Sequence, residues 1–192
     1  MKKEISIKLY ASELIYDVQN KTYLTGRSRS DGNNHEQVAN MQANDDEENE
    51  NQVVRSIGNA WGDIKMRLSE YIVSAQTSGN NAQIDKDTNL EVTLKMPSNY
   101  NQATVDTIST ALHQYIVNSA IADWFTITNK TDAKDYLDMA IANIAEVREA
   151  INKRVRPERP QPEPAGGDEL SSNTAENSTT AENSTDATNT EG

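Results

Sequence analysis

The side chains in this sequence that could carry out acid–base or metal chemistry are few and lie far apart. Histidine, the usual general base and a common metal ligand near neutral pH, occurs only at His35 and His113. These two residues belong to different predicted elements. His113 follows Leu112 on a predicted helix, which favours a half-buried structural imidazole. The sequence therefore indicates no catalytic or metal-binding histidine pair.

Two acidic segments also fall short of a metal site. The segment from Asp85 to Glu91 begins like a calcium-binding loop, which requires glycine at its sixth position and glutamate at its twelfth. Those positions hold Leu90 and Met96, so we predict a polar turn that leads into a strand. The acidic cluster from Asp45 to Glu50 would point its carboxylates around a helix, and it suits a helix N-terminus.

No catalytic motif stands out elsewhere. The sequence lacks a phosphate-binding loop, a Gly-x-Ser-x-Gly elbow, a His-Glu-x-x-His pair and a dinucleotide fingerprint. Because there are no cysteines, disulfides, thiolate zinc sites and cysteine nucleophiles are excluded. We therefore expect no enzyme activity, no catalytic or cofactor-binding residues and no metal. A further hypothesis is an enzyme whose carboxylate site is not recognisable as a motif.

The sequence does offer surfaces for helix packing. Gly58 and Gly62 lie inside the strongest helical pattern, where each costs about 1 kcal/mol relative to alanine. They indicate either the close approach of another backbone beside Trp61 or a locally flexible or kinked helix. The pattern predicts one long helix from about Asp46 to Ser74. Its apolar residues are Val54, Ile57, Trp61, Ile64, Leu68, Tyr71 and Ala75.

Aromatic and basic side chains add further interface candidates. Trp124 and Phe125 are adjacent, so they cannot both face the same core; one should pack inside the domain while the other covers a loop or meets a partner. The basic cluster that contains Lys153 and Arg154 either complements a helix dipole or docks an acidic partner. The predicted interface residues are Gly58, Trp61, Gly62, Trp124, Phe125, Lys153 and Arg154.

Two short strands and further helices complete the predicted fold. Alternating apolar residues predict strands around Ile7 and Val92, which should pair with each other or with a neighbouring chain. The stretch from Gly26 to Asn34 is predicted to be a loop. Besides the long helix, we predict helices that begin at Glu13, after Ser98 or Asn99, and at an N-cap on Thr131 whose inward residues are Leu137, Ala140, Ile144, Val147 and Ile151.

The predicted fold class is mainly α (α+β), with about four long helices in a bundle-like arrangement and two short strands. The order of elements suggests a β-α-α duplication. This helical domain would span residues 1–155. Residues 156–192 are Pro-rich and then polar, with Thr-Ala-Glu-Asn-Ser-Thr at 174–179 and again at 180–185. Such a segment lacks the apolar surface needed to order itself, so we predict a disordered tail.

Charge and hydropathy argue against two classes of partner, nucleic acids and membranes. The net charge is −12, of which residues 156–192 contribute −6, and an acidic chain is repelled by phosphate backbones. No segment approaches the ~18 apolar residues of a membrane span. The lysines near Met1 are followed by alternating polar residues and not by the apolar core of a signal peptide. We expect a cytoplasmic protein with no nucleic-acid or membrane partner.

Two stretches resemble an uncharacterised family found in prophages and phage-like elements of Bacteroidetes-type bacteria. They are residues 56–62 (Ser-Ile-Gly-Asn-Ala-Trp-Gly) and, more strongly, residues 121–133 (Ile-Ala-Asp-Trp-Phe-Thr-Ile-Thr-Asn-Lys-Thr-Asp-Ala) running on to residues 152–157 (Asn-Lys-Arg-Val-Arg-Pro). The resemblance covers about residues 4–157. It implies a role in a phage particle or its assembly, and the family supplies no catalytic residues.

Together these observations predict a non-enzymatic structural or assembly protein that acts through helix-packing interfaces, as a component of a phage head, neck or tail. Its partner would be a protein, either itself as a homo-oligomer or another assembly component. It would reside in the cytoplasm of a bacterial host or in a phage particle. The alternative is a small cytosolic adaptor or regulator that uses its Pro-rich tail as a peptide ligand.

Overall fold

The computed structural model describes residues 3–77 and 79–157. The chain divides into two units between Arg156 and Pro157, and the first unit is described here. From residue 158 onward the predicted tail lies outside the described residues, so its disorder and the boundary at residue 155 stay predictions. The elements are β1 (Lys3–Tyr10), α1 (Ala11–Ser28), α2 (His35–Met41), α3 (Glu47–Arg67), β2 (Ile72–Ala75), β3 (Asn89–Met96), a 3-10 turn (Gln102–Thr104), α4 (Val105–Thr128) and α5 (Lys130–Asn152).

The mainly helical class is confirmed, but the described residues form five α-helices and three strands where about four and two were predicted. The strands make one antiparallel sheet in the order β1-β3-β2, so the two predicted strands pair within the chain. Ile5, Ile7 and Leu9 of β1 are buried on one face, as a period of two requires. The order of elements does not repeat as β-α-α, because β2 and β3 follow three helices.

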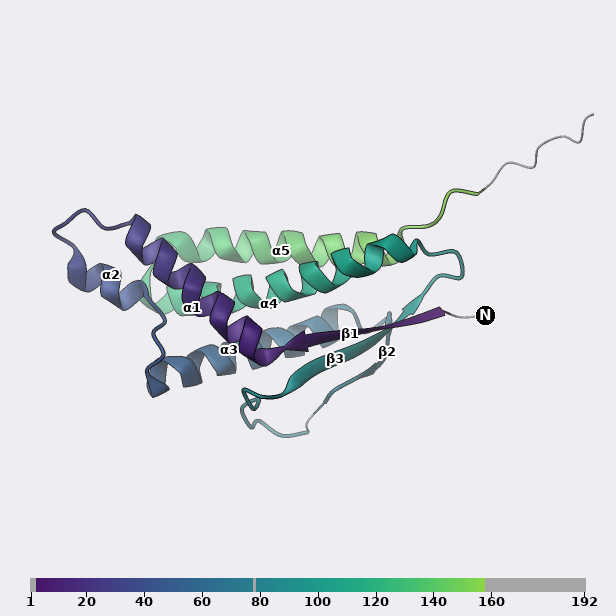
Figure 1. Ribbon diagram of the computed structural model, residues 1–192, viewed down its shortest axis with the longest axis horizontal. Coiled ribbons are helices and arrows are strands. Elements are labelled where there is room, and N and C mark those ends of the chain that lie inside the picture. Colours follow the sequence, from purple (N-terminus) through teal and green to yellow (C-terminus); the bar gives the residue numbers. More distant parts are fainter. Residues whose placement is uncertain (1–2, 78, 158–192) are drawn as a thin grey trace, which may run out of the picture. The chain divides into compact units, whose positions relative to one another are not determined.

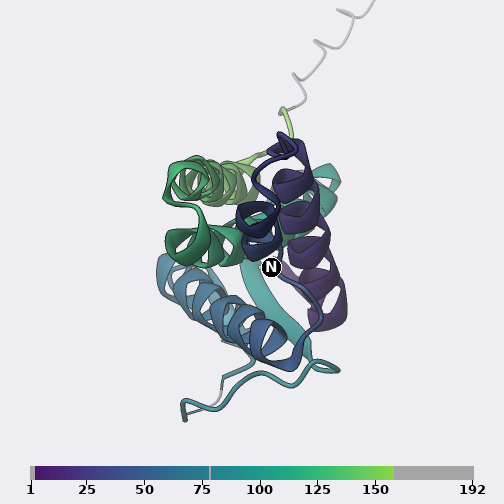
Figure 2. The ribbon, with the colours of Figure 1, turned by 90° about the vertical axis from the view of Figure 1, so that its left-hand side faces the viewer.

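The α4 helix is the centre of the helical layer. In Figure 1 it runs beside α5, with α1 in front of it. Figure 2 shows α5, α4 and α3 stacked on one side and α1 on the other. Because α4 has neighbours on several sides, Trp124 and Phe125 are both buried, which corrects the prediction that they cannot share a core. Trp124 donates a hydrogen bond to the Met41 carbonyl at the end of α2, and Phe125 packs against Tyr136 of α5.

The long helix predicted from Asp46 to Ser74 is two elements. Helix α3 ends at Arg67, and after a turn the chain forms strand β2. Tyr71 and Ala75 continue the helical spacing of apolar residues by coincidence. Both lie after the end of α3 and are partly buried against the core. The decisive factor is pairing of β2 with β3, a contact between segments far apart in the sequence.

The loop predicted from Gly26 to Asn34 is also partly helical. Helix α1 continues to Ser28 and buries Gly26 against α2. A Cβ atom at Gly26 would lie 3.0 Å from the Val38 carbonyl oxygen, so this glycine permits the close approach of two helices. Tyr23 lies on the side of α1 opposite the buried Leu14 and is 45% exposed.

The remaining helix starts differ from prediction by a few residues. Helix α1 begins at Ala11, before the predicted start at Glu13. Helix α4 begins at Val105 after the 3-10 turn, in which the Asn101 side chain accepts a hydrogen bond from the Ala103 N–H. Helix α5 begins at Lys130, so Thr131 lies inside the helix and is not its N-cap. Such ends depend on local capping geometry that spacing does not reveal.

The two glycines of α3 do not mark the approach of another backbone. Among the described residues, a Cβ at Gly58 would meet only the Ile84 side chain, at 3.4 Å, and a Cβ at Gly62 would have nothing within 4 Å. Helix α3 is uninterrupted from Glu47 to Arg67. The interpretation that these glycines admit a backbone beside Trp61 is therefore wrong.

Candidate functional site

A polar network joins α3 to α4 on the side of α4 that faces away from α1. The Tyr115 hydroxyl donates to the Asp63 carboxylate, and Arg67 Nε donates to Asp63 Oδ2 over 2.6 Å. Burial alone would raise the pKa of Asp63, but the hydrogen bonds from Tyr115 and Arg67 outweigh it and lower that pKa. The same burial, together with the bond to Asp63, raises the pKa of Tyr115. Asp63 is thus held as a paired anion.

A second polar contact joins the same helices further along. The buried Ser56 side chain of α3 lies beside the carboxyl group of Asp123 of α4. Desolvation raises the pKa of Asp123, and the neighbouring Ser56 hydroxyl opposes that rise. Ser56 precedes Asp63 in α3 whereas Asp123 follows Tyr115 in α4, so the two helices run antiparallel.

Helix α5 lines the other side of the same surface of α4. It is held there by a hydrogen bond of 2.9 Å from Asn118 to Asn143. At one end, Arg148 Nη2 donates to the Arg67 carbonyl over 2.8 Å and ties α5 to the end of α3. Two large apolar side chains of α5, Leu137 and Ile141, are each 51% exposed here.

These residues line a shallow groove along α4, between α3 and α5, which we call the α3–α5 groove. It consists of two adjoining hollows of about 220 and 330 Å³. From Tyr115 to Thr126 its floor is about 16 Å long, at 1.5 Å per residue. The lining residues are Ser56, Asn59, Ala60, Asp63 and Arg67 of α3; Tyr115, Ser119, Ala122, Asp123 and Thr126 of α4; and Lys130, Ala133, Lys134, Leu137, Ala140 and Ile141 of α5.

The spacing of these residues gives the groove its shape. Each helix contributes side chains three, four or seven positions apart, which form one stripe per helix. Small residues such as Ser119, Ala122 and Ala140 form the floor and part of one wall, whereas Leu137 and Ile141 project at the rim. A floor of small side chains beside one apolar rim is a shape into which the side chains of another helix can pack.

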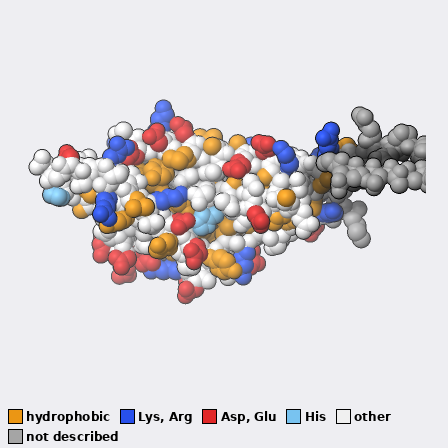
Figure 3. Space-filling model, turned by 45° about the horizontal axis from the view of Figure 1, so that its top comes forward, with side chains coloured by type: hydrophobic (Ala, Val, Ile, Leu, Met, Phe, Trp, Pro, Cys, Tyr) orange, Lys and Arg blue, Asp and Glu red, His pale blue; other side chains and the backbone are white. Residues whose placement is uncertain are grey.

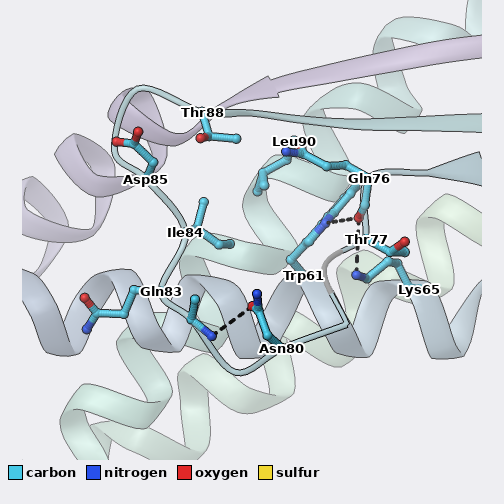
Figure 4. A pocket seen from close by; sticks show the side chains of 11 residues that line it. Trp61, Lys65, Gln76, Thr77, Asn80, Gln83, Ile84, Asp85, Thr88 and Leu90 are labelled. Atoms are coloured by element: carbon cyan, nitrogen blue, oxygen red, sulfur yellow. Dashed lines mark hydrogen bonds between the residues drawn. The ribbon is translucent and has the colours of Figure 1, made fainter.

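A separate hollow of about 270 Å³, outside the α3–α5 groove, lies beside Trp61 (Figure 4). The segment that connects β2 to β3 crosses α3 there. The Gln76 carbonyl accepts hydrogen bonds from Trp61 Nε1 at 3.4 Å and from Lys65 Nζ at 3.3 Å. Ile84 of the same segment faces Gly58. Trp61 is only 4% exposed and belongs to the hydrophobic core, so it is not available to a partner.

None of the residues predicted for an interface lines the α3–α5 groove. Trp61 lies under the loop just described, and Trp124 and Phe125 lie in the core on other sides of α4. Lys153 pairs with Glu149 at 3.6 Å, and Arg154 Nη1 donates to the side-chain oxygen of Asn99.

Gly62 is exposed on α3. The interface role of all these residues stays a prediction. The groove itself was missed, because Leu137 fits the apolar stripe of α5 in the sequence and only the structure shows that its side chain is exposed. Two of the segments that carry the phage resemblance, residues 56–62 and 121–133, contribute side chains to the groove from α3, from α4 and from the start of α5.

Comparisons with family models, curated proteins and solved structures return no match for this chain. Among residues 3–77 and 79–157, no helix has the length and apolar character needed to cross a membrane. In the same described part, no three His, Asp or Glu side chains come together as a metal-binding group.

Proposed function

We propose that this chain is a non-enzymatic structural or assembly protein that binds a helix of a protein partner in the α3–α5 groove. The observation that carries the proposal is the exposure of Leu137 and Ile141 beside a floor of small side chains. Fully burying a Leu or Ile side chain contributes about 1.5–3 kcal/mol, and these two residues gain only part of that within the chain. A partner helix would supply the rest.

The charged groups of the groove favour a role in binding a partner over a role in catalysis. The Asp63 carboxylate already accepts bonds from Tyr115 and Arg67, so it is not free to move a proton. Lys130 and Lys134 are exposed at the opposite end of the groove. Their charge favours a partner helix with acidic residues at that end.

The resemblance to a prophage family extends this proposal to a phage virion, as a component of its head, neck or tail. In such a particle the chain would work by holding neighbouring subunits together through helix packing. The cytoplasm of a bacterial host would then be the place of synthesis and the particle the final location.

The test is incorporation into particles. Three chains are produced in the strain that encodes the protein: wild type, Leu137→Glu/Ile141→Glu (the groove variant) and Val73→Glu as a control. Val73 is 49% exposed on β2, so the control changes a similarly exposed apolar residue outside the groove. We expect mass spectrometry of purified particles to find the wild type and the control at equal abundance and the groove variant strongly depleted.

Two outcomes would each overturn part of the proposal. Absence of the wild-type chain from particles would remove the virion role, and undiminished incorporation of a folded groove variant would remove the groove as the binding site. A chain truncated after residue 156 distinguishes this proposal from the alternative hypothesis of an adaptor that binds through its tail. If truncation abolishes partner binding while the groove variant binds normally, the protein is an adaptor that acts through its tail.

A further inference from the structure

Helix α1 carries an exposed aromatic stripe on its outer face. Tyr16 is 62% exposed, Tyr23 45% and Leu24 53%. The buried residues of α1, such as Leu14 and Val18, lie on the opposite side of the helix. In Figure 3, hydrophobic side chains lie among charged ones over the part of this face where α1 runs. We call the exposed residues 16, 20, 23, 24 and 27 the α1 stripe.

The α1 stripe and the α3–α5 groove lie on opposite sides of α4. His113 contacts Asp17 of α1 at 2.8 Å, and Gln114 accepts a hydrogen bond from Lys21 at 2.6 Å. His113 lies two residues before Tyr115, a rotation of about 200° around the helix, so the α1 side and the groove side are nearly opposed. Figures 1 and 2 show the same arrangement, with α1 on one side of α4 and α3 and α5 toward the other.

The two surfaces match in length and in pattern. The stripe runs from Tyr16 to Arg27 with the spacing 0, 4, 7, 8 and 11. The floor of the groove runs from Tyr115 to Thr126 with the same spacing. Each is therefore about 16 Å long. One offers projecting tyrosine and leucine side chains, and the other offers small residues between an apolar rim on α5 and a polar rim on α3.

Charge favours one direction of docking. Glu13 is exposed one turn before Tyr16, where the α1 stripe begins. At one end of the groove, the exposed Lys130 and Lys134 outnumber Asp123, so that end has a net positive charge. A helix laid in the groove with Glu13 at that end would place opposite charges together. On a chain whose net charge is −12, this local match opposes the general repulsion between copies.

We infer that the occupant of the groove is a second copy of this chain, whose α1 stripe packs between α3 and α5. The inference rests on the proposed function, because it names the partner of the same groove. A surface on one side that binds a different surface on the other side is a heterologous interface. Repeating it produces a ring if the rotation closes and a filament if it does not.

The test uses two full-length variants, each of which destroys one half of the interface. The stripe variant is Tyr16→Glu/Tyr23→Glu, and the groove variant is Leu137→Glu/Ile141→Glu. Val73→Glu is again the control, and circular dichroism checks that each chain is folded. Light scattering coupled to size-exclusion chromatography measures the molar mass from micromolar to millimolar protein. We expect wild type and control to exceed the mass of two chains and each variant alone to have the mass of one.

The decisive sample is an equimolar mixture of the two variants. The stripe variant retains an intact groove and the groove variant an intact stripe, so one interface can form between them. We expect a complex of one copy of each with the mass of two chains and no larger species. A wild type that stays monomeric, a wild type that stops at a dimer, or a mixture that stays monomeric would overturn the inference.

Failure here is distinguishable from failure of the proposed function. A chain that enters particles through its groove but is monomeric after purification would show that another protein's helix occupies the groove. The proposed function would stand in that case. A chain that polymerises but is absent from particles would leave the inference standing and remove the virion role.

Discussion

The two sides of α4 have similar polar content but different fates. On the side that faces α1, the chain supplies its own cover: Asp17 meets His113, and Lys21 meets Gln114. On the side between α3 and α5, Tyr115 is paired with Asp63 and buried, yet Asp123 and Thr126 stay exposed and no further element of the described chain covers the groove. Hydrogen-bond pairing between α3 and α4 therefore does not by itself close this surface of α4. The uncovered side is the one with small side chains.

The largest predicted effect tests the covered side of α4. Trp124→Ala should lower the free energy of unfolding by about 3–5 kcal/mol, because it removes a buried aromatic side chain and leaves the Met41 carbonyl without its donor. Chemical denaturation measures the change. Trp124→Phe, which keeps most of the volume but not the N–H, should lose clearly less. Equal losses in the two variants would show that the hydrogen bond matters more than packing.

The sequence predicted those parts of the fold that rest on one repeated local contact. Strands β1 and β3 followed from a period of two, and α4 and α5 from apolar spacings of three and four. Strand β2 was missed because its four residues gain order only by pairing with β3. Helix α2 was not among the predicted helices, because its seven residues depend on burying Val38 and Met41 under its neighbours.

The groove could not be predicted for a related reason. An apolar stripe indicates that one face of a helix will be buried, but it does not reveal which elements pack against that face. Leu137 fits the inward stripe of α5 together with Ala140 and Ile144. Ala140 and Ile144 are buried, whereas Leu137 is exposed. Whether Leu137 is covered depends on how far α3 lies from α5, which is set by the packing of both helices on α4.

The second prediction concerns the ion pair that ties α1 to α5 on the covered side. Asp132 is buried and is held by Arg29 Nη2 at 2.7 Å and by the Asn129 side chain at 2.8 Å. Arg29→Ala should lower the free energy of unfolding by about 2 kcal/mol. This is less than for a fully buried pair, because Arg29 is 58% exposed and the Asn129 bond remains. Thermal and urea unfolding measure it.

Arg29→Lys is the matched control for this ion pair. It keeps the charge but not the two-pronged geometry of Arg29, which donates to both oxygens of Asp132. An intermediate loss is expected. If Arg29→Ala were neutral, the connection between α1 and α5 would not contribute to holding α1 over α4.

The third prediction uses pH to examine the polar network on the uncovered side. Because the pKa of Asp63 is lower in the folded state than its value of about 3.9 in unfolded chains, its contribution is fully present above pH ~3.9. That contribution disappears as the pH falls through the folded value. Asp63→Asn should therefore cost about 1 kcal/mol at pH 7 and nothing at strongly acidic pH, as measured by urea unfolding at each pH.

Asp123→Asn gives the opposite slope and serves as the control for Asp63. The pKa of Asp123 is raised in the folded state, so its ionised form disfavours folding as the pH rises. Relative to wild type, Asp123→Asn should gain stability with increasing pH, whereas Asp63→Asn should lose it. Two parallel slopes would contradict the difference between a carboxylate paired with Arg67 and one that is only partly desolvated.

The smallest effect on stability is expected at the residue that matters most for binding. Leu137→Ala should change the free energy of unfolding by no more than about 0.5 kcal/mol, because the side chain is 51% exposed and fills no cavity. Residues whose removal costs the fold nothing but abolishes association have their interaction partner outside the chain. If Leu137→Ala instead cost as much as Trp124→Ala, the groove would be closed in solution by the chain itself, and the contrast between the two sides of α4 would vanish.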